Sequence, residues 1–105
     1  MASIKDLKKD VVRALGQLSS DCFIVDYVLG KDSDEVGDLY SETYTKAEEI
    51  YARIKAYPRE KGAQGRKARR EYFRGLEQEF QKLFNEQNER LIAIVEKDTA
   101  EGAER

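Results

Sequence analysis

The sequence predicts an all-α fold, an antiparallel three-helix up-down-up bundle with a long C-terminal helix. The chain has one proline and seven glycines in 105 residues, which leaves little room for strands and the turns that join them. Apolar residues recur at steps of three and four over three long stretches, the spacing of one helix face. A short link and one longer polar loop separate the stretches, so we expect neighbouring helices to run antiparallel.

The first helix is expected over residues 3–29, with Ser3 as its N-cap and Gly30 in the C′ position that commonly ends a helix. Residues 22–29 are apolar on nearly every side, around a single Asp26, so this segment should be buried on more than one side. The same segment is rich in β-branched and aromatic residues, which favours a strand as the alternative. No second strand is available to pair with it.

The second helix is expected to begin at Ser33, a capping residue that two acidic residues follow in the first turn. Pro58 should set its end, because the residue before a proline disfavours the helical conformation. Its apolar residues step by about 3.5 on average, the period of helices that wrap around a neighbour. Three tyrosines on one side should line the core, and a partly wet protein interface is the alternative: Tyr40, Tyr44 and Tyr51.

The third helix is expected over residues 66–97, which contain no proline and would span about 48 Å. It is longer than the other two, so it should overhang the bundle or supply part of an intermolecular seam. Residues 59–65 are expected to form the loop before the third helix, and Gly65 is expected to cap that helix. Residues 98–105 carry no periodicity and should fray. We therefore predict one domain over residues 1–98 and a frayed tail over 99–105.

Composition bounds the location and the class of partner. The net charge is −2 and the pI is near 5.3, which argues against a general nucleic-acid or membrane-surface binder. No apolar run approaches the roughly 20 residues that span a bilayer, and the charged N-terminus lacks the apolar core of a signal peptide. The single cysteine, Cys22, cannot form an intrachain disulfide and fits a reducing compartment. We expect a cytoplasmic protein without a membrane segment.

The chain is poor in catalytic side chains. It has no histidine, so the commonest general base and metal ligand is missing. Cys22 lies on an apolar face, where a thiol acts as a small hydrophobic residue. We therefore predict no catalytic residue, no cofactor and no metal ligand.

Acidic pairs are the alternative route to catalysis. Glu35 and Asp38 are three residues apart, as are Glu86 and Glu89, and such pairs on facing helices could chelate Mg²⁺. The spacing resembles that of the all-α nucleotide pyrophosphohydrolases, in which Glu-x-x-Glu and Glu-x-x-Asp pairs face each other. That resemblance implies a carboxylate–Mg²⁺-dependent hydrolase as a second alternative function. With 21 acidic residues in 105, pairs at this spacing also arise by chance.

Charge is unevenly distributed along the chain. Residues 59–74 contain seven basic and two acidic side chains, whereas residues 21–50 contain nine acidic and two basic ones. Cations near a helix N-terminus oppose the macrodipole at a cost of about a few tenths of a kcal/mol each, so an anion should compensate them. The candidates are the acidic second helix, in the same or another copy, and an external phosphate or nucleic acid. The predicted anion-binding residues are Arg66, Lys67, Arg69, Arg70 and Arg74.

The leading hypothesis is a non-enzymatic helical-bundle protein that acts through protein–protein contacts, as a homodimer or with an unidentified protein partner. A domain of this size buries a modest core, so a second copy would add stability. The predicted interface residues come from residues 22–29 and from the third helix: Phe23, Tyr27, Leu29, Phe80 and Phe84. The first alternative is an adaptor that binds an anion or nucleic acid through the basic residues of 59–74.

Overall fold

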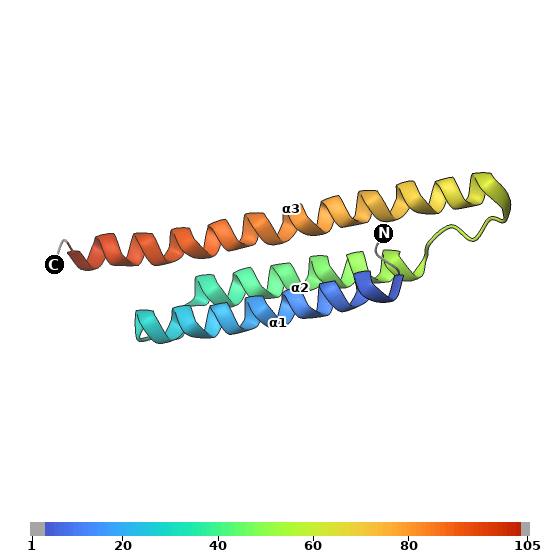
Figure 1. The fold of residues 1–105 in the computed structure, drawn as a ribbon. Helices are drawn as coiled ribbons and strands as arrows, with labels where there is room; N and C mark the ends of the chain where they lie inside the picture. The colour runs from blue at the N-terminus through green and yellow to red at the C-terminus, as the bar shows by residue number, and fades with distance from the viewer. Residues whose placement is uncertain (1–3, 104–105) are drawn as a thin grey trace.

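The computed structural model describes the backbone of residues 4–103 and the side chains of residues 4–98. Over that range the chain forms three helices and no strand: α1 (Ile4–Leu29), α2 (Asp34–Lys55) and α3 (Gly62–Ala103). The helices run up, down and up, and each packs against the other two (Figure 1). The all-α, up-down-up prediction is therefore confirmed, and residues 22–29 are helical.

The turn between α1 and α2 has the capping that the sequence predicts. Gly30 has a left-handed φ of 71°, and its N–H donates to the carbonyl of Tyr27 at 3.2 Å. The N–H of Lys31 donates to the carbonyl of Asp26 at 3.2 Å, which completes a Schellman motif. The Ser33 hydroxyl accepts from the N–H of Val36 at 3.4 Å, as an N-cap does. The predicted cap Ser3 lies outside the described residues.

The core is a single cluster of buried apolar side chains from all three helices. They are Leu7, Val11, Leu18, Cys22 and Val25 of α1, Val36, Leu39, Ala47, Ile50 and Ile54 of α2, and Leu76, Leu83, Phe84 and Leu91 of α3. Two polar side chains, Thr43 and Gln87, are buried among them. The Gln87 amide donates to the Thr43 hydroxyl at 2.7 Å, so this pair links α2 to α3 inside the core.

The molecule is a rod rather than a sphere. Its principal extents are 65 × 19 × 17 Å and its radius of gyration is 17.5 Å, whereas a compact chain of this length would have a radius of gyration of about 13 Å. The cause is α3, whose 42 residues span about 63 Å. Figure 1 shows α3 extending beyond α1 and α2 at both ends of the rod.

Three helix boundaries differ from the predicted ones. Helix α2 ends at Lys55, ahead of Pro58, which was expected to set its end. Helix α3 starts at Gly62, so part of the expected loop is helical, and it continues to Ala103, so residues 99–103 of the expected tail are helical too. Gly65 lies in the first turn of α3 rather than ahead of it. A Cβ at this position would lie 2.0 Å from the carbonyl oxygen of Glu60, so only glycine fits there.

Candidate functional site

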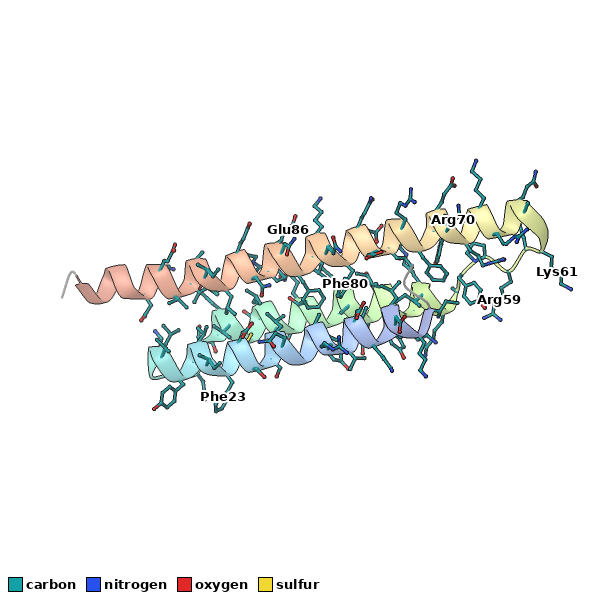
Figure 2. All side chains as sticks on the ribbon, viewed as in Figure 1. Phe23, Arg59, Lys61, Arg70, Phe80 and Glu86 are labelled. Atoms are coloured by element: carbon teal, nitrogen blue, oxygen red, sulfur yellow. The ribbon has the colours of Figure 1, made fainter. Side chains whose placement is uncertain are left out.

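Large apolar side chains are exposed on the outer face of α1, in its C-terminal half. We call this surface the α1 outer patch; its exposed fractions are Phe23 74%, Ile24 56%, Tyr27 82% and Val28 65%. Figure 2 shows Phe23 pointing away from the other two helices. Contiguous exposed apolar surface of this kind marks an interaction site more often than a plain solvent face.

Apolar surface continues from the patch into the groove between α1 and α3. Ile24 lines this groove, which has a volume of about 430 Å³, and Ile92 of α3 lines it too. Ile92 is itself 57% exposed. The expectation that residues 22–29 are buried on more than one side is wrong within one chain, because only Cys22 and Val25 of this segment are buried and Ile24 and Val28 are exposed. Ile92 was not among the predicted interface residues.

The five predicted interface residues separate into two groups. Phe23 and Tyr27 are exposed, as an interface requires, but Phe84 is buried in the core, and Leu29 and Phe80 are partly buried against it. The rings of Phe80 and Phe84 contact each other, with centroids 5.1 Å apart. Phe80 and Phe84 of α3 thus pack within the same chain, as does Leu29 of α1, and the structure leaves only Phe23 and Tyr27 of the five on an open surface.

The N-terminal half of the same α1 face is basic. Lys5, Lys9 and Arg13 are exposed there, and Arg13 makes only a loose ion pair with Asp10, at 3.9 Å. Between these cations and the apolar patch lie two small exposed residues, Gly16 and Ser20. Steps of three and four connect all of these positions, so they share one face. This face is therefore basic at one end, small in the middle and apolar at the other end.

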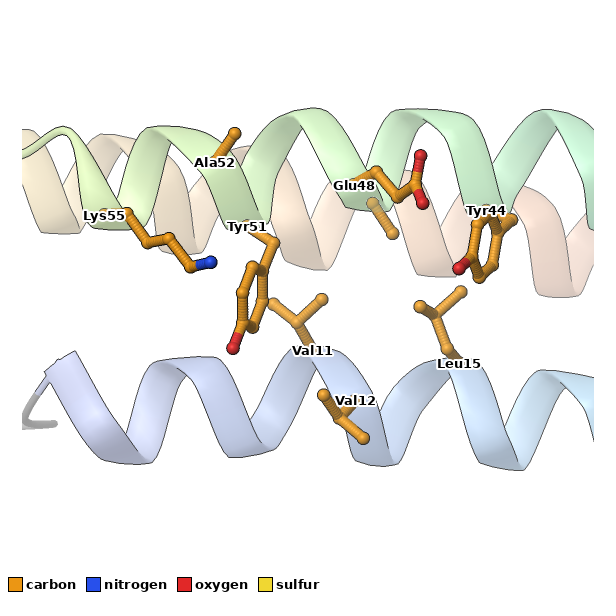
Figure 3. Close-up of a pocket in the computed structure, with 9 residues that line it drawn as sticks. Val11, Val12, Leu15, Tyr44, Glu48, Tyr51, Ala52 and Lys55 are labelled. Atoms are coloured by element: carbon orange, nitrogen blue, oxygen red, sulfur yellow. The ribbon is translucent and has the colours of Figure 1, made fainter.

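A shallow groove separates α1 from α2 (Figure 3). Its volume is about 420 Å³, and Val12 of α1 and Tyr44 and Tyr51 of α2 are among the side chains that line it. The Lys55 ammonium lies 4.9 Å from the centre of the Tyr51 ring, and a hydrogen bond with the Glu48 carboxylate raises the pKa of Tyr44. Two tyrosines thus line a surface that is partly exposed to solvent. The side chains that line this groove include no cysteine, and the chain has no histidine.

The predicted anion-binding residues lie where α3 leaves the bundle. Arg66, Lys67, Arg70 and Arg74 are exposed, and none of them has an ion-pair partner among the side chains of residues 4–98. Arg69 is different, because the residue is half-buried and its guanidinium donates to the carbonyl of Glu60 at 2.6 Å. Arg69 therefore fixes the loop onto α3, and the other four cations face solvent.

Loop residues extend this basic end of the rod. Figure 2 places Arg59 and Lys61 in the loop, close to the start of α3, and Arg70 two turns further on. The Arg59 guanidinium lies 4.8 Å from the centre of the Tyr57 ring and donates to the Lys55 carbonyl at 3.4 Å. Arg59 is thus held against the end of α2.

The acidic residues of α2 pair with the other half of α3. Glu42 accepts from Arg90 at 2.5 Å, and Glu35 accepts from Lys97 at 3.5 Å. Hydrogen bonds from Arg90 and from Lys46 lower the pKa of Glu42 from 4.5 to about 2. Among the described side chains, no acidic residue of α2 forms an ion pair with the exposed cations of residues 66–74.

The two acidic pairs do not form a metal site. Glu35, Asp38, Glu86 and Glu89 are all exposed, and Figure 2 shows Glu86 on the side of α3 that faces away from α1 and α2. Among the described side chains, no group of three or more His, Cys, Asp or Glu residues is placed to hold a metal ion. The facing arrangement that a Mg²⁺-dependent hydrolase needs is thus absent from these four residues.

Cys22 is shielded from reaction. It is 8% exposed, and burial raises the pKa of its thiol, with further increases from the nearby charges of Asp26 and Asp21. A thiol needs its thiolate form to act as a nucleophile, so Cys22 belongs to the core rather than to a site.

Comparison with known proteins adds no relative. No protein-family model matches the chain, and neither the curated proteins nor the solved structures yield a match. Across residues 4–103, no helix combines the length and the apolar character needed to cross a bilayer. The features that point to a function are therefore the α1 outer patch and the basic end of α3.

Proposed function

We propose that this protein is a non-enzymatic helical-bundle protein that acts through protein–protein contacts and forms a homodimer through the outer face of α1. The observation that carries this proposal is the α1 outer patch, whose four apolar side chains are 56–82% exposed. Burying one large apolar side chain contributes about 1.5–3 kcal/mol, so covering the patch would stabilise a complex substantially.

A second copy is the partner that we favour, because the α1 face complements itself. In an antiparallel pair of α1 helices that cross between Gly16 and Ser20, Arg13 of one subunit lies opposite Phe23 of the other. Lys9 lies opposite Tyr27 in the same register. A cation that lies over an aromatic ring is attracted to the ring by about 0.5–1 kcal/mol at exposed sites. The small residues at the crossing allow close approach of the helices, and the pairing is the self-complementary type that a twofold dimer requires.

The test compares two substitutions at Phe23 by light scattering at several protein concentrations. Phe23→Lys places a cation opposite Arg13, so it should raise the dissociation constant of the dimer by about tenfold or more, which corresponds to ~1.4 kcal/mol. Phe23→Glu loses the same apolar contact but places a carboxylate opposite Arg13, so it should weaken the dimer less. Both variants should keep the helical circular dichroism of the native protein, because Phe23 is exposed in the subunit.

Tyr44→Lys is the matched control. Tyr44 is an exposed aromatic residue on α2, outside the α1 outer patch, and is 44% exposed. Its substitution should leave the dissociation constant unchanged. A native protein that stays monomeric at high micromolar concentration would contradict the dimer. Equal effects of Phe23→Lys and Phe23→Glu would contradict only the antiparallel register.

A further inference from the structure

We infer that the start of α3 carries a binding site for the phosphate backbone of nucleic acids. The site consists of Arg66, Lys67, Arg70 and Arg74, which we call the α3 basic face. This inference goes beyond the proposed dimer, because the α3 basic face lies on a different helix, toward the end of the rod away from the α1 outer patch (Figure 1).

The four cations share the solvent side of α3. Arg66, Arg70 and Arg74 are spaced by four residues, so they form a row with a rise of about 6 Å from one to the next. Lys67 lies beside this row. The last of these turns packs against the bundle on its opposite side, where Tyr72 and Phe73 pack against the core and Leu76 follows as a buried residue.

Contacts with the end of α2 and with the preceding loop hold the part of α3 that carries the α3 basic face. The Tyr72 hydroxyl donates to the Arg53 carbonyl at 2.6 Å, and the rings of Tyr57 and Phe73 lie 5.7 Å apart. Arg69 fixes the preceding loop through its hydrogen bond with the Glu60 carbonyl. A ligand would therefore meet a row of cations already in place on a formed helix, which reduces the ordering cost of binding.

Among the described side chains, the four cations of this face have no ion-pair partner. The first turn of α3 contains no acidic residue, and the helix dipole adds to the positive potential there. Glu71 is the one acidic side chain among residues 66–74, and it forms no ion pair among the described side chains. Glu42 and Glu35 of α2 pair with Arg90 and Lys97 instead.

The net charge of −2 does not oppose this binding, because the charges are separated in space. The acidic turn between α1 and α2 lies toward the opposite end of the 65 Å rod from the α3 basic face (Figure 1). Salt screens exposed charges beyond about 10 Å at 0.1 M ionic strength. A ligand at the basic face therefore experiences the local cations and little of the distant carboxylates.

A nucleic-acid backbone matches the chemistry of the face better than an acidic protein surface does. Three of the four residues are arginines, whose planar guanidinium groups bind phosphate through two parallel hydrogen bonds. A row of evenly spaced cations suits a polymer with regularly repeated negative charges. The nearby aromatic rings of Tyr57, Tyr72 and Phe73 are engaged in packing, so bases have no stacking platform. Binding should therefore be independent of base sequence.

Fluorescence anisotropy with mixed-sequence duplex DNA and single-stranded RNA over a salt series tests the inference. Four phosphate contacts predict a slope of about −3.6 for log K against log salt on duplex DNA, or about 150-fold weaker binding at 200 mM than at 50 mM. Single strands should give a slope of about −2.8. Arg70→Gln should reduce the duplex slope by about 0.9, and glutamine at all four positions should abolish binding.

Lys82→Gln is the matched control, because Lys82 is an exposed cation on α3 outside the α3 basic face; it should leave affinity and slope unchanged. The Phe23→Lys variant should bind the probes as the native protein does, so failure of the dimer and failure of this inference are distinguishable. No binding at ~50 mM salt overturns the inference, because electrostatic association is strongest there. Arg70→Gln without effect also overturns it. Equally tight binding of polyglutamate overturns it in favour of an acidic protein segment.

Discussion

At the scale of single residues, the buried pair Thr43 and Gln87 fixes how α2 and α3 align. Thr43 donates to the Leu39 carbonyl at 2.7 Å and accepts from the Gln87 amide, also at 2.7 Å. The Gln87 carbonyl accepts from Arg90 at 2.9 Å, and Arg90 reaches Glu42 at the surface. Sliding α3 along α2 would leave these buried groups unpaired, so the pair specifies one register rather than merely adding stability.

Breaking this pair should be costly only when one partner is left behind. Thr43→Val strands the Gln87 amide in the core and should lower the free energy of unfolding by about 1–3 kcal/mol. Adding Gln87→Leu removes the stranded group, so the double variant should recover part of the loss. Urea unfolding followed by circular dichroism measures the free energy of unfolding of the native protein, of Thr43→Val and of the double variant.

Thr45→Val serves as the control for this cycle. Thr45 lies on the same helix and makes the same kind of bond, to the Ser41 carbonyl at 3.1 Å, but it is exposed. Its substitution should change the free energy of unfolding by no more than about 0.5 kcal/mol. If Thr43→Val costs no more than Thr45→Val, the buried hydrogen bond does not stabilise the fold.

At the scale of the elements, the sequence predicted each helix but not the ends of the longest one. Apolar periodicity marks the part of a helix that packs against a core. In α3 this part lies between Tyr72 and Val95, and the apolar stripe identified it correctly. The turns beyond it overhang the bundle and carry polar side chains, so no period marks them. The capping residues Gly30 and Ser33 were predicted correctly, because a cap depends only on residues close to it in the sequence.

Gly65 should tolerate no side chain, although it lies in a helix, where alanine is normally preferred. A Cβ there would overlap the Glu60 carbonyl at 2.0 Å, so Gly65→Ala must displace the loop that Arg69 holds. We expect a loss of about 1–3 kcal/mol from this overpacking. Gly75 is also within α3 but has open space around its Cβ position, so Gly75→Ala should stabilise by about 0.5–1 kcal/mol. Thermal unfolding of both variants would contradict this account if the two melting temperatures moved in the same direction.

At the scale of the whole molecule, the sequence could not decide which apolar residues remain exposed. Phe23 and Phe84 both lie on apolar helical segments, yet Phe23 is 74% exposed and Phe84 is 7% exposed. The difference depends on which arc of each helix the other two cover, and that is a property of the assembled bundle. Arg69 illustrates the same limit, since only the folded loop shows that it binds the Glu60 carbonyl while its neighbours face solvent.

An antiparallel dimer through α1 would have a shape that scattering can recognise. Because the subunits cross near the middle of α1, two rods of 65 Å would lie side by side. The longest dimension should therefore grow by far less than twofold, and the two α3 basic faces should point toward opposite ends of the particle. At a concentration at which Phe23→Lys is monomeric, small-angle X-ray scattering should give this variant a radius of gyration slightly above the 17.5 Å of its Cα atoms, and the native dimer a moderately larger value. A native particle about twice as long as the variant would indicate end-to-end association and exclude pairing through the α1 face.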